Sequence, residues 1–182
     1  MKRVTDLPET IRCAIVTVSD RSAAGQRPDL SGAALEQCLN KLAWSVSSKH
    51  LIPDEFLQIK ELLQKLAHSG TVDLILTIGG TGFSPRDVTP EATQAVIEKN
   101  ALGLVEAMRA ENLKINTHAM LSRACAGICA STLIVNLPGN PNAAVENFNV
   151  IAPAIPHAIA LLHSSPDSEQ GHQLHPRGDS HG

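Results

Sequence analysis

The residues best suited to chemistry lie in the segment 79–91, which follows an apolar run ending at Ile78. The segment begins Gly-Gly-Thr-Gly, and three glycines in four positions allow the backbone to turn tightly and to bring its N–H donors close to a bulky anion. Asp87 follows, and residues 89–91 (Thr-Pro-Glu) have the order of a helix start: an N-cap, a proline and an acidic side chain at the positive helix end. This order predicts a site for phosphate groups and a metal ion.

The segment 79–87, called the glycine loop below, differs from both familiar phosphate loops. It lacks the Gly-Lys-Ser/Thr ending of a P-loop, and its glycines do not have the Rossmann spacing. A tight turn without a ligand is the alternative, and glycines alone would favour it. Arg86, Asp87 and two hydroxyl residues in the same turn shift the interpretation towards phosphate binding. The loop residues expected to contact a substrate are Gly79, Gly80, Thr81, Gly82 and Arg86.

Strands and helices alternate in the hydropathy pattern of the chain. Residues 12–18 and 72–78 are nearly continuous apolar runs, as expected of strands that are buried on both faces. Residues 55–69 carry apolar side chains at three- and four-residue steps, which predicts an amphipathic helix. The alternation predicts an α/β fold with a mainly parallel sheet flanked by helices. The expected strands are 12–18, 44–52, 72–78 and 133–137, and the expected helices are 31–42, 55–69, 89–99, 102–110 and 142–162.

Polar or glycine-rich residues follow each of the four expected strands. Ser19 and Asp20 follow the first strand, Asp54 the second, the glycine loop the third, and residues 136–140 the fourth. Ligands of parallel sheets bind at the carboxyl ends of the strands. We therefore expect these residues to line one cleft rather than four separate loops.

The composition predicts a cytoplasmic, single-domain protein. A net charge of −3 and an aromatic content of 2% offer neither a basic surface nor stacking platforms for nucleic acid. We expect no signal peptide and no membrane contact, because no run of about 18 apolar residues is present. Cys125 and Cys129 lie four residues apart, but no second cysteine or histidine pair completes a zinc site. All four cysteines are therefore expected to be reduced, buried thiols.

The segment TIGGTGFSPRDVTPEAT (77–93) resembles the signature of the molybdopterin adenylyltransferases, which act late in molybdenum cofactor synthesis. The resemblance covers about residues 12–163 and includes the motifs TVSDR, IPDE, MLSR and NLPGNPNA. It implies a three-layer α/β domain that forms a homotrimer. It also implies that the terminal phosphate of molybdopterin attacks the α-phosphorus of ATP, with the help of Mg²⁺, and that pyrophosphate leaves. Such a phosphate is already anionic, so positioning and charge neutralisation should dominate catalysis.

The resemblance assigns roles to individual residues. Asp54 in IPDE and Asp87 in PRD are the expected catalytic carboxylates and Mg²⁺ ligands. Each could instead cap the helix that follows. This alternative is stronger for Asp54, because for the helix after Asp87 the nearer N-cap candidate is Thr89. The other expected contacts also have structural alternatives. Ser19 and Asp20 could form an ordinary turn after the first strand, Arg123 could be a solvated surface charge, and residues 138–139 could form a type II turn. Expected substrate contacts outside the glycine loop are Ser19, Asp20, Ser122, Arg123, Asn136, Pro138, Gly139 and Asn140.

Residues 1–163 are expected to form the domain. Residues 164–182 lack hydrophobic periodicity and are rich in Ser, Gly, Pro and Asp, which predicts a disordered tail or a linker. A linker would suit the two-domain relatives whose other half inserts the metal, so a metal-insertion domain or protein is a candidate partner. Apolar stripes at 102–108 and 151–159 face either a trimer contact or the core of the subunit.

Two classes of function stay open at the level of sequence. The first is the ATP-dependent enzyme, and the second is a pterin-binding or scaffold domain of the same fold without turnover. The glycine loop together with Asp54 and Asp87 favours the enzyme. Cys129 stands where the family often carries a basic residue, which counts towards the second class. A hydrolase of nucleotide diphosphate linkages is a more distant third, because IPDE and PRDVTPEAT resemble the transferases more closely.

Overall fold

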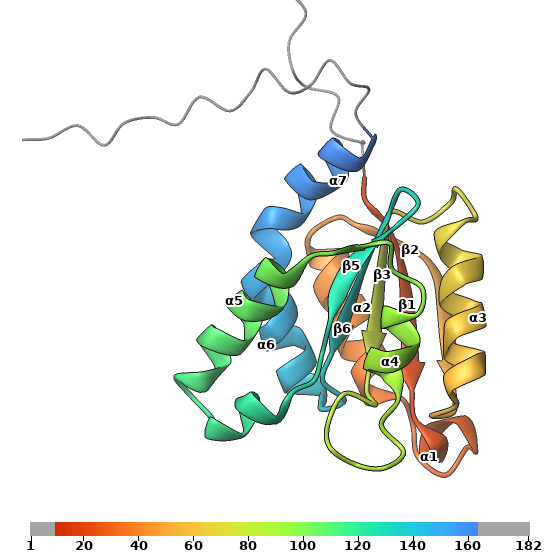
Figure 1. Cartoon of the computed structure of the whole chain (residues 1–182), viewed down its shortest axis with the longest axis vertical. Coiled ribbons are helices and arrows are strands. Elements are labelled where there is room, and N and C mark those ends of the chain that lie inside the picture. Colours follow the sequence, from red (N-terminus) through yellow and green to blue (C-terminus); the bar gives the residue numbers. More distant parts are fainter. Residues whose placement is uncertain (1–9, 164–182) are drawn as a thin grey trace, which may run out of the picture.

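The computed structural model describes residues 10–163; residues 1–9 and the expected tail 164–182 lie outside the described part. Six strands form one sheet in the order β2-β1-β3-β6-β5-β4 (Figure 1). The first four strands of that order run parallel, whereas β5 runs antiparallel to both of its neighbours, β6 and β4. The strands are β1 (Arg12–Val18), β2 (Ser45–Ile52), β3 (Leu74–Ile78), β4 (Lys99–Asn100), β5 (Ala126–Cys129) and β6 (Thr132–Leu137).

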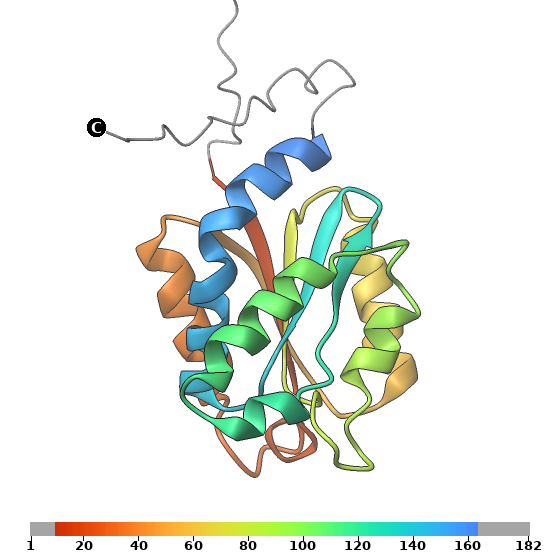
Figure 2. The ribbon, with the colours of Figure 1, turned by 60° about the vertical axis from the view of Figure 1, so that its left-hand side comes forward.

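Helices cover both faces of the sheet, which gives three layers (Figure 2). One face packs against α3 and α4, and the other packs against α2, α5, α6 and α7. The α/β class and the mainly parallel sheet predicted from the sequence are confirmed. The helices are α1 (Asp20–Ala23), α2 (Leu30–Lys41), α3 (Phe56–Ala67), α4 (Thr89–Gln94), α5 (Leu102–Leu113), η1 (Thr117–Leu121), α6 (Pro141–Ile151), η2 (Ala152–Ala154) and α7 (Ile155–His163).

The structure departs from the sequence prediction around β4 and β5. The helix expected over 89–99 ends at Gln94, and Lys99–Asn100 instead pairs with β5 at the edge of the sheet. The hydropathy pattern predicts neither strand, because β4 has two residues and β5 has four. Runs this short cannot display a period of two clearly enough to be read.

Most side chains of the apolar stripes at 102–108 and 151–159 face the core of the subunit. Val105 and Met108 of α5 are buried in the core, and so are Ile151, Ile155 and Ile159 near the end of the described chain. The core alternative is therefore confirmed for these five residues. The stripe on α5 keeps one exposed member, Leu102, whose side chain is 59% exposed.

The helical stretch Pro141–His163 is long and apolar enough to cross a membrane if length and composition alone are considered. The sequence prediction of no such stretch is wrong in this respect. Phe148, Ile155 and Ile159 are fully buried in the core beneath the sheet. A core helix passes the same test of length and composition, so the stretch is weak support for membrane insertion.

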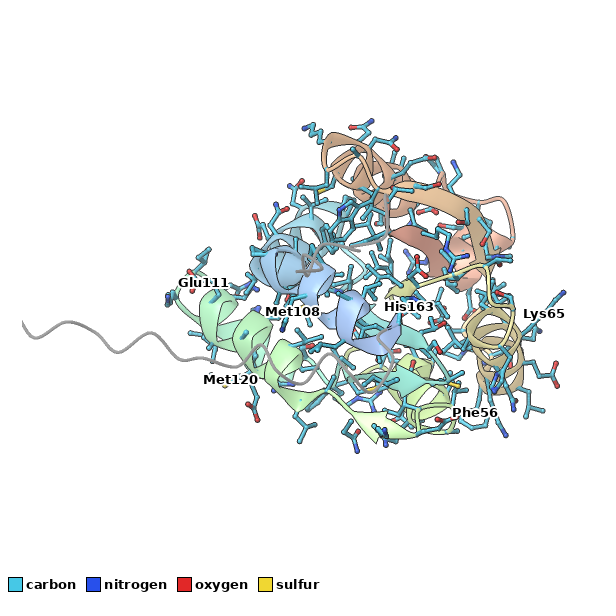
Figure 3. The ribbon with its side chains drawn as sticks, turned by 90° about the horizontal axis from the view of Figure 1, so that it is seen from above. Phe56, Lys65, Met108, Glu111, Met120 and His163 are labelled. Atoms are coloured by element: carbon cyan, nitrogen blue, oxygen red, sulfur yellow. The ribbon has the colours of Figure 1, made fainter. Side chains whose placement is uncertain are left out.

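An ion pair between a buried carboxylate and a half-exposed arginine joins the amino ends of the central strands. Asp73 is 1% exposed and accepts from Arg12 three times: from the backbone N–H at 2.8 Å, from Nε at 3.0 Å and from Nη2 at 2.6 Å. His163, the last described residue, places Nε2 3.0 Å from Asp73 Oδ1. Figure 3 looks onto this end of the molecule and shows His163 between α5, which carries Met108, and α3, which carries Lys65. One carboxylate thus connects β1, β3 and α7.

Replacing Asp73 by alanine should lower the free energy of unfolding by about 2–4 kcal/mol, because the N–H groups of Arg12 lose their acceptor. Burial raises the pKa of Asp73, but the hydrogen bonds and charge of Arg12 outweigh it and hold the pKa below its ordinary value. A depressed carboxyl pKa contributes stability above about pH 4, and this contribution is lost as the pH falls through the folded-state pKa. Urea unfolding at pH 7 and about pH 3 should therefore show a smaller difference between wild type and Asp73→Ala at low pH.

The surface pair of Glu36 and Lys49, with Nζ 2.8 Å from Oε2, provides the control. Glu36→Ala should cost no more than about 0.5 kcal/mol, because exposed ion pairs contribute little. An equal loss of stability in the two variants would contradict the role given to Asp73.

Candidate functional site

The carboxyl ends of the parallel strands gather the expected site residues at one edge of the sheet, the lower end in Figure 1. Asp20 and Asp54 follow β1 and β2 and exchange hydrogen bonds: the Asp20 N–H donates to Asp54 Oδ2 at 2.9 Å, and the Asp54 N–H donates to Asp20 Oδ1 at 3.0 Å. The glycine loop begins where the Gly79 N–H donates to the carbonyl of Leu137, the last residue of β6. The expected single edge is therefore present.

The first two residues of the glycine loop have backbone conformations that favour glycine. Gly79 has φ of 99° and Gly80 has φ of 63°. A Cβ at Gly79 would lie 2.3 Å from the carbonyl oxygen of Val18. A Cβ at Gly80 would lie 2.3 Å from Thr89 Oγ1 and 2.9 Å from Asp54 Oδ1. The absence of side chains here lets the loop, the start of α4 and Asp54 approach one another closely.

Asp54 and Asp87 both line the second of the two cavities at the loop. Burial raises the pKa of Asp54, a hydrogen bond from the Asp20 backbone opposes this, and the charges of Asp20 and Asp87 raise it further. A Cβ at Gly82 would lie 2.9 Å from Asp87 Oδ2, so this carboxylate is also turned towards the loop. Such a half-buried group of carboxylates is stabilised by a cation placed among them.

The hydroxyl of Thr89 adds a third oxygen to this group. Thr89 is fully buried, and within the described residues its Oγ1 is one of two buried side-chain atoms that lack a hydrogen-bond partner. Carboxylate and hydroxyl oxygens are the hard ligands that Mg²⁺ prefers. Asp54, Asp87 and Thr89 therefore have the donor chemistry for Mg²⁺. The backbone N–H of Thr89 is already bonded to the carbonyl of Gly80 at 3.1 Å, so its hydroxyl is held beside the loop.

Arg86 balances the charge of Asp20. Its Nε and Nη2 lie 3.0 Å from the two carboxylate oxygens of Asp20, and Nη2 is also 2.8 Å from Glu55 Oε1. These hydrogen bonds, with one from the backbone of Asp54, hold the pKa of Asp20 below its ordinary value. Because Asp20 is neutralised by Arg86, Asp54 and Asp87 remain as the carboxylates available to a cation.

Arg123, an expected substrate contact, is bonded to the glycine loop. Its backbone N–H donates to the carbonyl of Thr81, Nε donates to the carbonyl of Gly82 at 2.6 Å, and Nη2 donates to the carbonyl of Asp87 at 2.7 Å. Nη1 forms an ion pair with Glu91. The guanidinium therefore holds the glycine loop through its carbonyl groups. The alternative interpretation of Arg123 as a freely solvated charge is wrong. A phosphate contact would have to use the N–H groups that these bonds leave over.

Asn136 is fully buried, and its side chain is fully used inside the protein. Nδ2 donates to the hydroxyls of Thr77 and Thr93 at 2.8 and 2.9 Å, while Oδ1 accepts from the backbone and the thiol of Cys125. Its side-chain amide links β3, β6 and α4. Only the backbone and Cβ of Asn136 are therefore available to a ligand. Asn140 caps α6 by accepting from the N–H groups of residues 142 and 143.

Two cavities of about 470 Å³ each open on either side of the glycine loop. Both are lined by Gly80, Asp87 and Gly139, so they meet at the loop and one of the two key carboxylates. The first cavity lies against α5, η1 and α6 and is also lined by Ser122, Val105, Met108, Asn112, Leu121 and Asn147. The second lies against α1 and α2 and is also lined by Ser19, Arg27, Ser31, Asp54 and Asn140.

Several lining residues were missed by the sequence analysis. Arg27 and Ser31 enter the second cavity because Ser31 Oγ donates to the carbonyl of Gly139 at 2.7 Å, which closes α2 against the turn after β6. Met108 and Asn112 enter the first cavity because α5 crosses α6. An amphipathic pattern cannot reveal such roles, since these residues read as ordinary helix positions in sequence.

Comparison with known proteins identifies a matching family and similar folds. Residues 14–157 match the family described as a probable molybdopterin binding domain. The chain is 38% identical over 156 residues to a molybdopterin adenylyltransferase of Helicobacter pylori strain J99, and the match covers 85% of this chain and 89% of that protein. It is 42% identical over 164 residues to gephyrin of Dictyostelium discoideum, of which it spans 23%. The crystal structure of the molybdopterin biosynthesis enzyme MoaB from Thermus thermophilus superposes with a TM-score of 0.80 at 42% identity, covering 84% of this chain and 96% of that one.

The glycine loop makes a prediction about two alanine substitutions. Gly79→Ala should destabilise the protein by at least about 2 kcal/mol, because the new Cβ meets the Val18 carbonyl and the positive φ disfavours any side chain. Gly103→Ala in α5 should be neutral or stabilise by up to about 1 kcal/mol, because nothing lies within 4 Å of the new Cβ and alanine favours a helix. Thermal and urea unfolding measure both, and a harmless Gly79→Ala would show that the loop backbone can relax.

Proposed function

Since the chain belongs to the family of molybdopterin binding domains that its residues 14–157 match, we propose that it is a molybdopterin adenylyltransferase of molybdenum cofactor biosynthesis. The relative that carries this name is matched over 89% of its length. The observation that supports a transfer between two substrates is the pair of cavities that meet at Gly80, Asp87 and Gly139. One cavity would hold the pterin phosphate and the other would hold the nucleotide.

The proposed reaction joins the two phosphate groups at this junction. An oxygen of the terminal phosphate of molybdopterin forms a bond to the α-phosphorus of ATP, and the bond from that phosphorus to the bridging oxygen of the β-phosphate breaks. Adenylylated molybdopterin and pyrophosphate are the products. No proton has to be removed, since the attacking phosphate is anionic near neutral pH. The barrier arises mainly from bringing two polyanions into line.

The described residues supply positioning for such a step. The glycine loop lines both cavities, so those of its backbone N–H groups that are not bonded within the protein could donate to phosphate oxygens. Arg123 holds the loop through its bonds to the carbonyls of Gly82 and Asp87, and this keeps the donors in place. Asp54, Asp87 and Thr89 would hold Mg²⁺, which would neutralise charge on the phosphates when bound.

Cys129 lies away from this site. It ends β5 beside Thr132 at the amino end of β6, whereas the glycine loop follows the carboxyl ends of the parallel strands. It lines neither of the two cavities at the loop. The difference at this position therefore removes no charge from either cavity, and it gives no support to a scaffold domain without turnover.

We also propose that the subunits form a homotrimer. Support comes from large apolar side chains that remain exposed on α5 and in the segment after it: Leu102 is 59%, Ile115 78% and Met120 59% exposed. Leu102 begins α5 and the other two follow its end, so exposed apolar surface of the kind typical of a protein contact runs along this part of the chain. The gephyrin relative is several times longer than the matched part, which supports a metal-insertion domain or protein as a further partner.

Asp87→Asn should reduce pyrophosphate release from ATP, Mg²⁺ and molybdopterin at least about 100-fold, because a lost electrostatic contact in the transition state costs a few kcal/mol. Asparagine keeps an oxygen that can accept from the Ser84 N–H, so the loop should stay folded. Glu106→Gln removes an exposed carboxylate from α5 and should leave the rate unchanged. Near-normal release by Asp87→Asn would remove Asp87 from the mechanism, and a severely lowered unfolding temperature would support a structural role instead.

Light scattering of the native protein should give a mass near three times 19.3 kDa at micromolar concentration. Leu102→Glu should reduce this mass, because it places a charge in the exposed apolar region without entering the core. Leu57→Glu, at a side chain that is 64% exposed on α3, is the matched control and should leave the mass unchanged. A native mass near that of one chain would exclude the trimer.

A further inference from the structure

Three side chains that can bind metals converge at the end of the sheet opposite the glycine loop. His68 follows the last residue of α3, Glu98 directly precedes β4, and Cys129 ends β5. One potential ligand atom from each residue lies within 4.8 Å of the other two, and Cys129 Sγ is 4.0 Å from Glu98 Oε1. The three positions are far apart in sequence, which is why the cysteine spacing alone shows no metal site.

Backbone and hydroxyl contacts hold the three positions in one corner of the fold. The Glu98 N–H donates to the carbonyl of Ile128 at 2.7 Å, next to Cys129. Thr132, the strand partner of Cys129, donates its hydroxyl to the carbonyl of Ala67 at 3.2 Å, next to His68. Glu98 and the residue before His68 are thus both bonded to the β5–β6 hairpin, which carries Cys129. The fold therefore brings the three backbone positions together.

One hydrogen bond fixes the tautomer of the neutral His68 ring. Its Nδ1 lies 2.9 Å from the carbonyl oxygen of Gln64. A carbonyl can only accept, so Nδ1 carries the proton and Nε2 keeps a free lone pair. Metal-bound histidines commonly show this arrangement, in which the second nitrogen donates to a carbonyl and fixes the tautomer.

We propose that His68, Glu98 and Cys129 bind a divalent cation of the zinc type, with a fourth position open to water. Nitrogen, oxygen and sulfur ligands in a set of three are typical of Zn²⁺ and its neighbours, whereas Mg²⁺ and Ca²⁺ prefer oxygen alone. The site is distinct from the proposed Mg²⁺ site, which lies at the other end of the strands. It therefore does not rest on the proposed function.

Binding requires only a modest closure of the three side chains. Zinc ligands at about 2.0–2.3 Å from the metal lie roughly 3.3–3.8 Å from one another in a tetrahedron. Cys129 is buried and sits on a strand, whereas His68 and Glu98 are exposed and can turn towards it. The same exposure gives a metal ion access from solvent. A thiolate and a carboxylate together neutralise the two positive charges of the ion.

Titration of the reduced, metal-free full chain with Co²⁺ tests the proposal, because cobalt bound to a thiolate has a near-ultraviolet charge-transfer band. We expect the band to saturate at one Co²⁺ per chain and to disappear when Zn²⁺ is added. Carboxylates at the glycine loop and histidines elsewhere can bind Co²⁺, but they cannot produce this band. Cys129→Ser should abolish it, whereas Cys38→Ser, at a half-buried thiol on α2, should retain it.

His68→Asn and Glu98→Gln complete the test at exposed positions that leave the core intact. Each should raise the dissociation constant for Co²⁺ at least tenfold, as measured from the same band. These two variants decide the outcome even if Cys129→Ser fails to fold. Absence of the band in the native chain, its persistence in Cys129→Ser, or unchanged affinity in both exposed variants would overturn the proposal.

Discussion

The close approach of three strand ends is the constraint on which the site depends. At the end of β3, Gly79 is bonded to the end of β6, and its missing side chain leaves room for the carbonyl of Val18 at the end of β1. Gly80 then passes between Asp54 and Thr89 at a distance that no Cβ would permit. The carboxyl ends of three strands can therefore meet at one loop. Both cavities share this loop as a wall, and it places Asp87 between them.

The two arginines at this loop are bonded to groups of the protein itself, so little of their charge is left for a phosphate. Arg86 is paired with Asp20 and Glu55, and Arg123 is bonded to loop carbonyls and to Glu91. These arginines fix the geometry of the acidic residues and of the loop. Neutralisation of phosphate charge then falls to Arg27 in the second cavity, to backbone N–H groups and to a metal ion held by oxygen ligands. This division suits a reaction in which two anionic groups must come together.

The two ends of the sheet differ in how completely their polar groups are paired. At the carboxyl ends, polar groups are left partly unpaired, as shown by the hydroxyl of Thr89 and by the raised pKa of Asp54. At the amino ends, Asp73 is saturated by Arg12 and further contacted by His163, and the hydroxyl of Thr132 is bonded twice. Unpaired groups cost stability, so they are retained where a ligand can satisfy them. Paired groups at the other end hold the strands that carry the site.

The sequence by itself determined the fold class, the glycine loop and the acidic positions after the strands. Apolar runs and glycine clusters are local signals that can be read directly along the chain. The expected N-cap Thr89 is instead the first residue of α4, and its hydroxyl caps no N–H group. Strands β4 and β5 were missed because such short runs carry too few residues for a period to show. Tertiary structure alone decided the use of Arg123, which braces the loop, and of Asn136, whose amide is consumed within the core. It also brought His68, Glu98 and Cys129 together. Partners far apart in sequence meet only when strand order and helix packing are set, so no local pattern can encode them.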